Sequence, residues 1–294
     1  MKLARMNKYF SKTIFYPVLA AFFLVIVNPV LRQRKMENLD RGVIAVRKSA
    51  DSVFISWRLL ATDPGDISFN IYLQAGKGKP VKINSSPVRI STCFEDGNIN
   101  FNEDNTYYVH SVLNGKELKE DASYKINAGT PAGQYISIPL RTPDGYTPND
   151  ISPGDLDGDG EFEIVLHQTA RSIDTPSPGI SGIPVFQAYE MDGTFLWQIS
   201  LGRNIREGAH YTQFMVYDLD SDGIAEFACK TADGTIDGLG KVIGDSTKDW
   251  RNLDKSSGTY YGKVLDGPEY FTIFSGKTGE ALATANYIRS IRSS

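Results

Sequence analysis

Hydrophobic and polar side chains alternate along the chain between Gly42 and Ala128. The alternation is regular at residues 53–57 and 67–73, where every second side chain is apolar. A period of two is typical of strands with one buried face. Turn-forming pairs such as Asp96-Gly97 and Asn114-Gly115 break this region into short strands. We therefore predict a β-sandwich in residues 36–130, near the usual size of an immunoglobulin-like module.

Residues 131–294 have a different and repeated pattern. Two acidic loops begin at Asp155 and Asp218, and each leads into an apolar strand, a second strand, a turn and a third strand. This order is typical of propeller blades. The loops begin 63 residues apart, so the 164 residues hold about 2.6 repeats. Because propellers close with roughly four to eight blades, we expect an all-β protein that ends in an incomplete propeller of about two to three blades.

The two acidic loops share one pattern of carboxylates. Acids stand at the first, third and fifth positions, and a glutamate closes each loop at the ninth. Alternating carboxylates around a glycine turn bring hard oxygen ligands to one point, as Ca²⁺ requires, although an EF-hand places its glutamate at the twelfth position and is flanked by helices. The alternative is a solvated acidic turn. We predict structural calcium loops with the ligands Asp155, Asp157, Asp159, Glu163, Asp218, Asp220, Asp222 and Glu226.

Charge is distributed unevenly along the chain. Residues 1–35 contain seven basic residues and no acidic one, which leaves 24 bases against 35 acids in the remainder. The body of the protein thus lacks a broad basic surface, and nucleic acid is not an expected partner. The basic start and the apolar run at residues 14–27 match a secretory signal, or alternatively an uncleaved membrane anchor. In both cases we expect export, to a secreted, periplasmic or cell-surface location. We expect Cys93 and Cys229 to be buried free thiols.

Several longer strings resemble one enzyme family. The strings Gly208-Ala-His-Tyr-Thr-Gln213 and Lys230-Thr-Ala-Asp-Gly234, with others between residues 36 and 288, resemble the bacterial rhamnogalacturonan I lyases of polysaccharide lyase family 11. The resemblance implies a fibronectin-type-III-like sandwich followed by an eight-bladed, calcium-binding propeller. Such lyases continue beyond the point where this sequence ends, so we expect a fragment with little or no activity. An Asp-Asn loop of the family is expected to face substrate, and only Asp174 matches it here.

The resemblance also implies a reaction and a substrate. Such a lyase cuts pectic rhamnogalacturonan I by β-elimination, which needs a base for the C5 proton of galacturonate and a positive group near its carboxylate. The candidates are His167, His210 and Lys230, and each has an ordinary structural alternative. A calcium-braced carbohydrate-binding or adhesion module is the competing class, because integrin-type repeats also place acidic loops between propeller strands. The strings between the loops favour the lyase.

Overall fold

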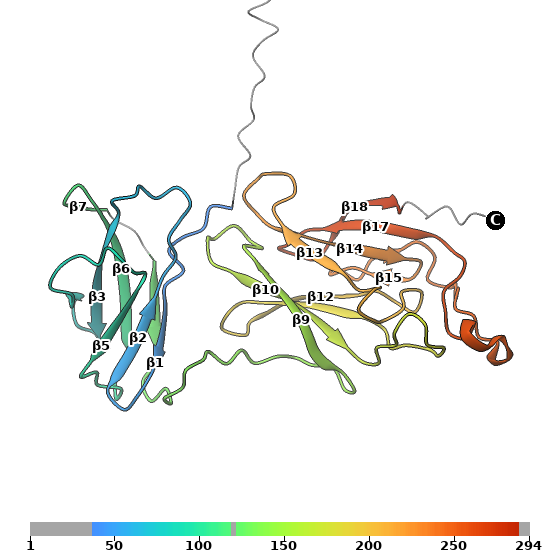
Figure 1. Cartoon of the computed structure of the whole chain (residues 1–294), viewed down its shortest axis with the longest axis horizontal. Helices are drawn as coiled ribbons and strands as arrows, with labels where there is room; N and C mark the ends of the chain where they lie inside the picture. The colour runs from blue at the N-terminus through green and yellow to red at the C-terminus, as the bar shows by residue number, and fades with distance from the viewer. Residues whose placement is uncertain (1–36, 119–121, 288–294) are drawn as a thin grey trace, which may run out of the picture. The chain divides into compact units, whose positions relative to one another are not determined.

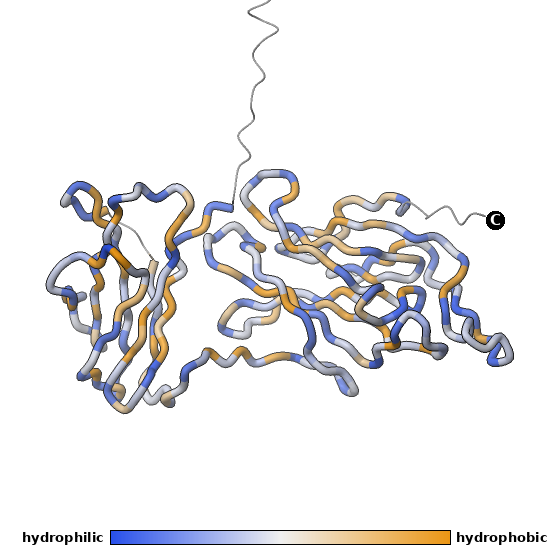
Figure 2. The backbone as a smooth tube through the Cα atoms, in the orientation of Figure 1, coloured by the Kyte–Doolittle hydropathy of each residue, from blue (hydrophilic) through white to orange (hydrophobic). Residues whose placement is uncertain are grey.

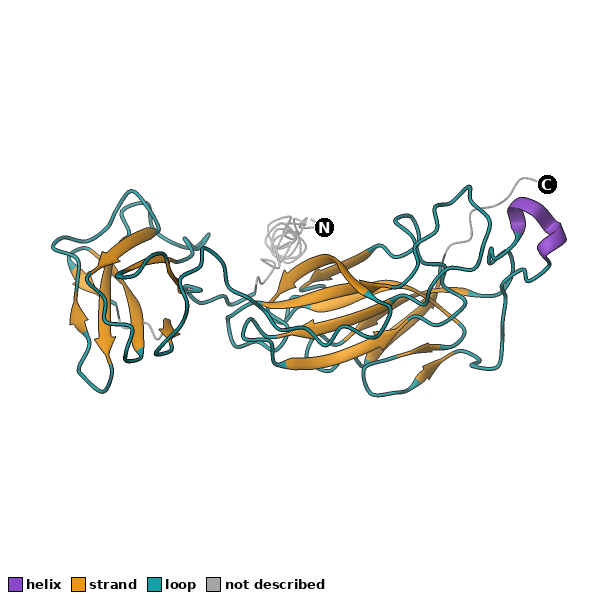
Figure 3. Ribbon diagram, turned by 90° about the horizontal axis from the view of Figure 1, so that it is seen from below, coloured by secondary structure: helices purple, strands orange, loops and turns teal. Residues whose placement is uncertain are grey.

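The protein is described by a computed structural model that covers residues 37–118 and 122–287. The predicted signal peptide or anchor at residues 1–35 lies outside these residues. Within them the chain is almost entirely β-structure, with one short 3₁₀ helix, η1 (Lys255–Tyr260) (Figure 3). No helix in the described ranges is long and apolar enough to cross a membrane. The all-β expectation is confirmed.

The first part of the chain forms two antiparallel sheets (Figure 1). One sheet has the order β1-β2-β5, and the other has the order β4-β3-β6-β7, with β8 also paired to β6. Their bounds are β1 (Ile44–Arg47), β2 (Ser52–Ser56), β3 (Ser68–Ala75), β4 (Val81–Lys82), β5 (Cys93–Gly97), β6 (Asn105–Leu113), β7 (Lys116–Glu117) and β8 (Ser123–Ile126). Alternate side chains of β2 and β6 are buried, as the period of two predicted. Both sheets contribute to one apolar core, which includes Val53, Ile55, Phe69 and Tyr107.

The first acidic loop lies within a sheet whose strands follow chain order. The sheet runs β9-β10-β11-β12, and a short hairpin, β15-β16, is added beside β12. Their bounds are β9 (Thr147–Gly154), β10 (Glu163–Thr169), β11 (Val185–Tyr189), β12 (Phe195–Ser200), β15 (Thr235–Ile236) and β16 (Val242–Ile243). The acidic loop joins β9 to β10. The repeat that we expected from the sequence began at the acidic loop, so it did not include β9. It also did not include the hairpin that joins this sheet.

The second acidic loop lies within an equivalent sheet. It joins β13 to β14 in a four-stranded sheet of order β13-β14-β17-β18. The bounds are β13 (Phe214–Tyr217), β14 (Glu226–Ala232), β17 (Glu269–Phe274) and β18 (Ala281–Asn286). Hydrophobic stretches of both sheets lie mainly along the strands, whereas many turns are hydrophilic (Figure 2). The two loops therefore occupy the same position in two similar antiparallel sheets.

A single apolar core joins these two sheets. The rings of Phe186 and Phe227 have centroids 4.9 Å apart, and those of Phe227 and Phe274 are 5.6 Å apart. Trp197 Nε1 donates a hydrogen bond to the carbonyl oxygen of Gly276 at 2.5 Å, which ties the first sheet to the second. Cys229 is buried in this core, as expected. Cys93 is exposed, so the expectation was wrong for that thiol, whose strand is paired only with β2.

Candidate calcium loops and groove

Hydrogen bonds from the backbone fix the shape of the first acidic loop. Asp155 accepts from the amides of Gly158 at 2.7 Å and Gly160 at 3.0 Å, one to each carboxylate oxygen. Glu163 Oε2 accepts from the amide of Leu156 at 2.6 Å. Both glycines have positive φ, 85° and 94°, which L side chains rarely adopt. The sequence therefore folds the loop tightly around its own first carboxylate.

The second loop repeats this hydrogen bonding. Asp218 Oδ1 accepts from the amide of Ser221 at 2.6 Å, and its Oδ2 accepts from that of Gly223 at 3.1 Å. Glu226 Oε2 accepts from the amide of Leu219 at 2.8 Å. One difference is that Ser221, at φ 66°, occupies the position that Gly158 has in the first loop.

The carboxylates converge in both loops. Oxygen atoms of Asp155, Asp157 and Asp159 lie within 4.8 Å of one another in the first loop, and those of Asp218, Asp220 and Glu226 do so in the second. Calcium takes oxygen ligands at about 2.3 to 2.6 Å, so oxygens on opposite sides of one ion are about 5 Å apart. These triads fit that size. The other two predicted ligands, Glu163 and Asp222, lie outside the triads, and Asp222 Oδ1 accepts from the amide of Ile224.

Burial makes these carboxylates costly without a cation. Asp155 and Glu163 are 0% exposed, and Asp218 and Glu226 are also buried. Burial, together with the neighbouring carboxylates of Glu190, Asp157 and Asp159, raises the pKa of Glu163 to about 8. Burial likewise raises the pKa of Asp155 and of Glu226. A buried ionised carboxylate needs a countercharge, which a divalent cation would supply, so the donor set fits Ca²⁺.

The segment that begins the described chain packs on the first loop. The amide of Asp40 donates to the carbonyl oxygen of Gly160 at 3.0 Å, and Arg58 Nη1 donates to the same oxygen at 2.9 Å. Burial, followed by the carboxylates of Asp155 and Asp218, raises the pKa of Glu37, which places this side chain near both loops. No local pattern in the sequence predicts these contacts, because they join residues about 100 positions apart.

A groove of about 1240 Å³ brings together two of the three predicted catalytic candidates. His210 and Lys230 both line it, together with Asn149 and Tyr211. His210 Nδ1 lies 3.0 Å from Thr175 Oγ1, and 3.7 Å from Oδ1 of Asp174, the predicted substrate-binding residue. Lys230 Nζ lies 3.4 Å from Glu269 Oε1. The groove therefore has one imidazole and one ammonium group on its surface.

His167, the third candidate, lies in a different environment. It is buried on β10, and its ring stacks on Phe186 at 5.0 Å. Its Nδ1 is 3.5 Å from Asn149 Nδ2, and Nε2 is buried without a hydrogen-bond partner in the described structure. Burial lowers the pKa of His167, so the imidazole is neutral near pH 7. This environment favours the structural alternative.

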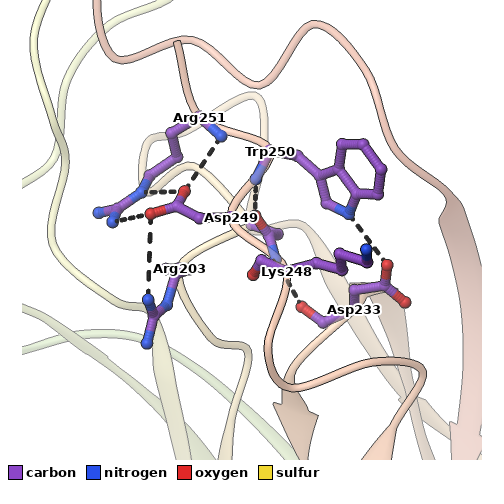
Figure 4. A network of polar contacts seen from close by, with 7 residues as sticks. Arg203, Asp233, Lys248, Asp249, Trp250 and Arg251 are labelled. Atoms are coloured by element: carbon purple, nitrogen blue, oxygen red, sulfur yellow. Dashed lines mark hydrogen bonds and ion pairs between the residues drawn. The ribbon is translucent and has the colours of Figure 1, made fainter. Parts of the chain in front are cut away.

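The acids that follow Lys230 stabilise turns. Asp233 accepts a hydrogen bond from Trp250 Nε1 at 2.9 Å (Figure 4). It also accepts one from the amide of Asp245 at 3.0 Å. Asp237 accepts from three backbone amides, those of Leu239, Lys241 and Ala281. Asp233 and Asp237 therefore stabilise turns, and among the described residues neither belongs to a group of three converging carboxylates.

Comparison with known proteins identifies the family. The family model described as Rhamnogalacturonan lyase family 11, C-terminal domain, matches residues 127–292, and the one described as Rhamnogalacturonan I lyases beta-sheet domain matches residues 34–127. The chain belongs to rhamnogalacturonan lyase family 11.

Curated relatives and solved structures agree with this assignment. Rhamnogalacturonan endolyase YesW of Bacillus subtilis (strain 168) is 45% identical over 265 residues, which are 86% of this chain and 40% of the relative. The exolyase YesX of the same organism is 45% identical over 267 residues, 87% of this chain and 40% of the relative. The structure of the Bacillus licheniformis rhamnogalacturonan lyase PL11 superposes with a TM-score of 0.76 at 46% identity, over 87% of this chain and 43% of that one. The chain spans about 40% of the length of the curated relatives that it matches.

Proposed function

We propose that the chain contributes to a lyase that binds rhamnogalacturonan I, a pectic polysaccharide, and cleaves it by β-elimination. The observation that carries this proposal is the groove, which combines His210 and Lys230 in a chain of a lyase family. The named relatives are an endolyase and an exolyase for rhamnogalacturonan, which supports the same substrate class.

The groove offers groups suited to each part of the reaction. The ammonium group of Lys230 would neutralise the galacturonate carboxylate, so that negative charge can build up at C5. The imidazole of His210 would accept the C5 proton, with Asp174 stabilising the imidazolium that forms. The C4 oxygen then departs with the electron pair of the C4–O bond and takes up a proton to become a hydroxyl group, and an unsaturated uronate remains. Water is not consumed, and the electron pair of the C5–H bond becomes the new double bond.

The architecture proposed for this lyase has two parts. The first is a fibronectin-type-III-like sandwich, supported by two sheets, one of three strands and one of five, around one core. The second contains two blades of a β-propeller, supported by two antiparallel sheets, one of six strands and one of four, each of which has four strands in chain order. We further propose that each acidic loop binds Ca²⁺ as a structural brace between the first two strands of a blade, in an exported protein that meets extracellular calcium.

A carbohydrate-binding module is the second candidate. It is favoured by one observation, which is that the His210 side chain is 69% exposed. Water competes with the transfer of the C5 proton to an imidazole that is so exposed. A module of this kind would bind rhamnogalacturonan I in the same groove without releasing product.

Binding and cleavage can be measured on the same samples. We expect the chain to be retarded in gels that contain rhamnogalacturonan I, and Lys230→Gln to weaken this binding by about tenfold. The matched control is Lys82→Gln, in exposed strand β4, which should bind as the wild type does. Ultraviolet absorbance of the unsaturated product tests cleavage, including the expectation of little or no activity. Release of product supports the lyase and contradicts the module, whereas binding without product is expected of this chain under both candidates. Equal binding by Lys230→Gln and wild type contradicts the groove as the site.

A further inference from the structure

The two acidic loops differ in the residue that faces their closing glutamate. In the first sheet, β10 pairs with β11 so that Ile164 is opposite Tyr189, and one step beyond the end of this ladder the side chains of Glu163 and Glu190 interact. In the second sheet, β14 pairs with β17 so that Phe227 is opposite Phe274, and the same step along the ladder sets Glu226 opposite Ser275. The first loop therefore has a carboxylate where the second has a hydroxyl.

One oxygen of the Glu163 carboxylate has no hydrogen-bond donor beside it, and the Glu163 side chain lies within hydrogen-bonding distance of that of Glu190. Glu163 is 0% exposed, and although its Oε2 accepts from the amide of Leu156, its Oε1 is buried with no hydrogen-bond partner in the described structure. The charged groups that face this carboxylate are Glu190, Asp157 and Asp159. A fully buried oxygen close to three other carboxylates forms a set of ligands that suits a cation.

Glu190 faces the same point from a separate segment. It follows β11 directly and is half-buried, and its charged neighbours are Asp157, Glu163, Asp159 and Asp192. Two carboxylates held together in a buried place repel each other unless a proton or a cation lies between them. Calcium takes six to eight oxygen ligands. The loop's own carboxylates supply fewer than this if each gives one oxygen, so the ion can accept a further carboxylate.

We propose that Glu190 is an additional ligand of the cation at the first loop, and that the first loop consequently binds Ca²⁺ more tightly than the second, where Ser275 stands in its place. This inference rests on the proposed binding of Ca²⁺ by the acidic loops. Its physical reason is ligand charge: affinity for Ca²⁺ rises with the number of carboxylates that surround the ion and with the rigidity of the segments that carry them. Glu190 adds a charge from a strand end that the sheet already holds in place.

Calorimetric titration with CaCl₂ on the full chain tests the ligand. Asp218→Asn removes the second loop's first ligand, so that the remaining binding reports on the first loop. In this background we expect Glu190→Ser to weaken Ca²⁺ binding by about tenfold. Asp192→Asn is the matched control: it removes one charge from the same turn, and Asn can still accept the hydrogen bond from the amide of Thr194. It should change affinity by less than about twofold.

The reciprocal exchange tests the comparison between loops. With the first loop disabled by Asp155→Asn, Ser275→Glu should tighten Ca²⁺ binding at the second loop. Thermal unfolding adds a second measurement, because Glu190→Ser should have opposite effects on stability without calcium and with calcium. Glu190→Ser removes a repulsion, so it should raise the Tm in EDTA while reducing the increase that Ca²⁺ produces.

The outcomes separate the inference from the proposed function. Calcium binding by wild type with equal affinity in Glu190→Ser overturns the role of Glu190 and leaves the calcium loops standing. Equal losses in Glu190→Ser and Asp192→Asn also overturn it, because the effect would then be general electrostatics. No Ca²⁺ binding by wild type overturns both. Glu190→Gln, which keeps the size of the side chain, replaces Glu190→Ser if the latter does not fold, and the same results are expected.

Discussion

The guanidinium carbon of Arg58 lies 4.0 Å from the centre of the Phe162 ring. Arg58 also donates to the carbonyl oxygen of Gly160, so it contacts the first acidic loop in two ways. We expect Arg58→Met, which keeps an apolar stem, to lower the free energy of unfolding by about 1 to 2 kcal/mol. Urea denaturation in CaCl₂ measures this change.

A control variant shows whether removing any positively charged side chain lowers the free energy of unfolding to the same extent. Lys48 forms an exposed ion pair with Glu95 at 2.8 Å, and such pairs contribute about 0 to 1 kcal/mol. Lys48→Met should therefore change the unfolding free energy little. If Arg58→Met were as stable as Lys48→Met, the packing of Arg58 on the loop would not stabilise the protein.

Gly276 is predicted to be indispensable for packing between the two loop-bearing sheets. A Cβ atom at this position would collide with the carbonyl oxygen of Ala225, and Trp197 donates to the carbonyl of Gly276 itself. We expect Gly276→Ala to lower the unfolding free energy by about 1 to 3 kcal/mol or more. In contrast, a Cβ on Gly97 meets no atom within 4 Å, so Gly97→Ala should stay within about 0.5 kcal/mol of wild type. Equal stabilities in thermal unfolding would refute this difference.

The local pattern of the sequence predicted most of the strands and both acidic loops. The period of two marked β2 and β3, and the second strand expected after the first acidic loop corresponds to β11. These features are local, because alternation and turn residues act over a few positions. The convergence of three carboxylates in each loop also follows from a nine-residue pattern.

Features that depend on pairing between distant segments were not predictable in this way. Glu190 lies near Glu163 only because β11 pairs with β10 in a particular register, and one step of slippage would turn it away. Arg58 reaches the first loop across about 100 residues. The groove likewise combines His210 with Lys230 through the pairing of β13 and β14, so its composition required the structure.

The corresponding positions Gly158 and Ser221 provide a reciprocal test of loop geometry. Both have positive φ, 85° and 66°, and an L side chain in that region costs about 1 to 2 kcal/mol. We expect Ser221→Gly to raise the unfolding free energy by up to about 1 kcal/mol, since the gain is partly offset by the greater freedom of glycine in the unfolded chain. Gly158→Ser should lower it by about 1 kcal/mol or more. Denaturation curves in which both variants shift in the same direction would contradict this account.

His167 should make the protein less stable in mild acid. Burial lowers its pKa in the folded state, so the unfolded chain binds the proton more readily. Stability linked to the neutral imidazole is complete above the unfolded pKa of about 6.5 and is lost as the pH falls below it. From about pH 7.5 to about pH 5.5, wild type should lose up to about 1.4 kcal/mol more than His167→Gln. His110→Gln, on β6, serves as the control and should lose as much stability over this pH range as the wild type does. Equal losses in wild type and His167→Gln would show that His167 is not responsible.

Thermal unfolding of the full chain in excess CaCl₂ and in EDTA tests most directly whether the acidic loops bind a structural cation. If Ca²⁺ binds only the folded state and its free concentration is about 100 times the dissociation constant, it adds about 2.7 kcal/mol to the free energy of unfolding. Ca²⁺ should therefore raise the Tm by several degrees. The double variant Asp155→Asn/Asp218→Asn should show no such rise, and MgCl₂ should not replace CaCl₂ for the wild type. An unchanged wild-type Tm in CaCl₂ and in EDTA would contradict the account.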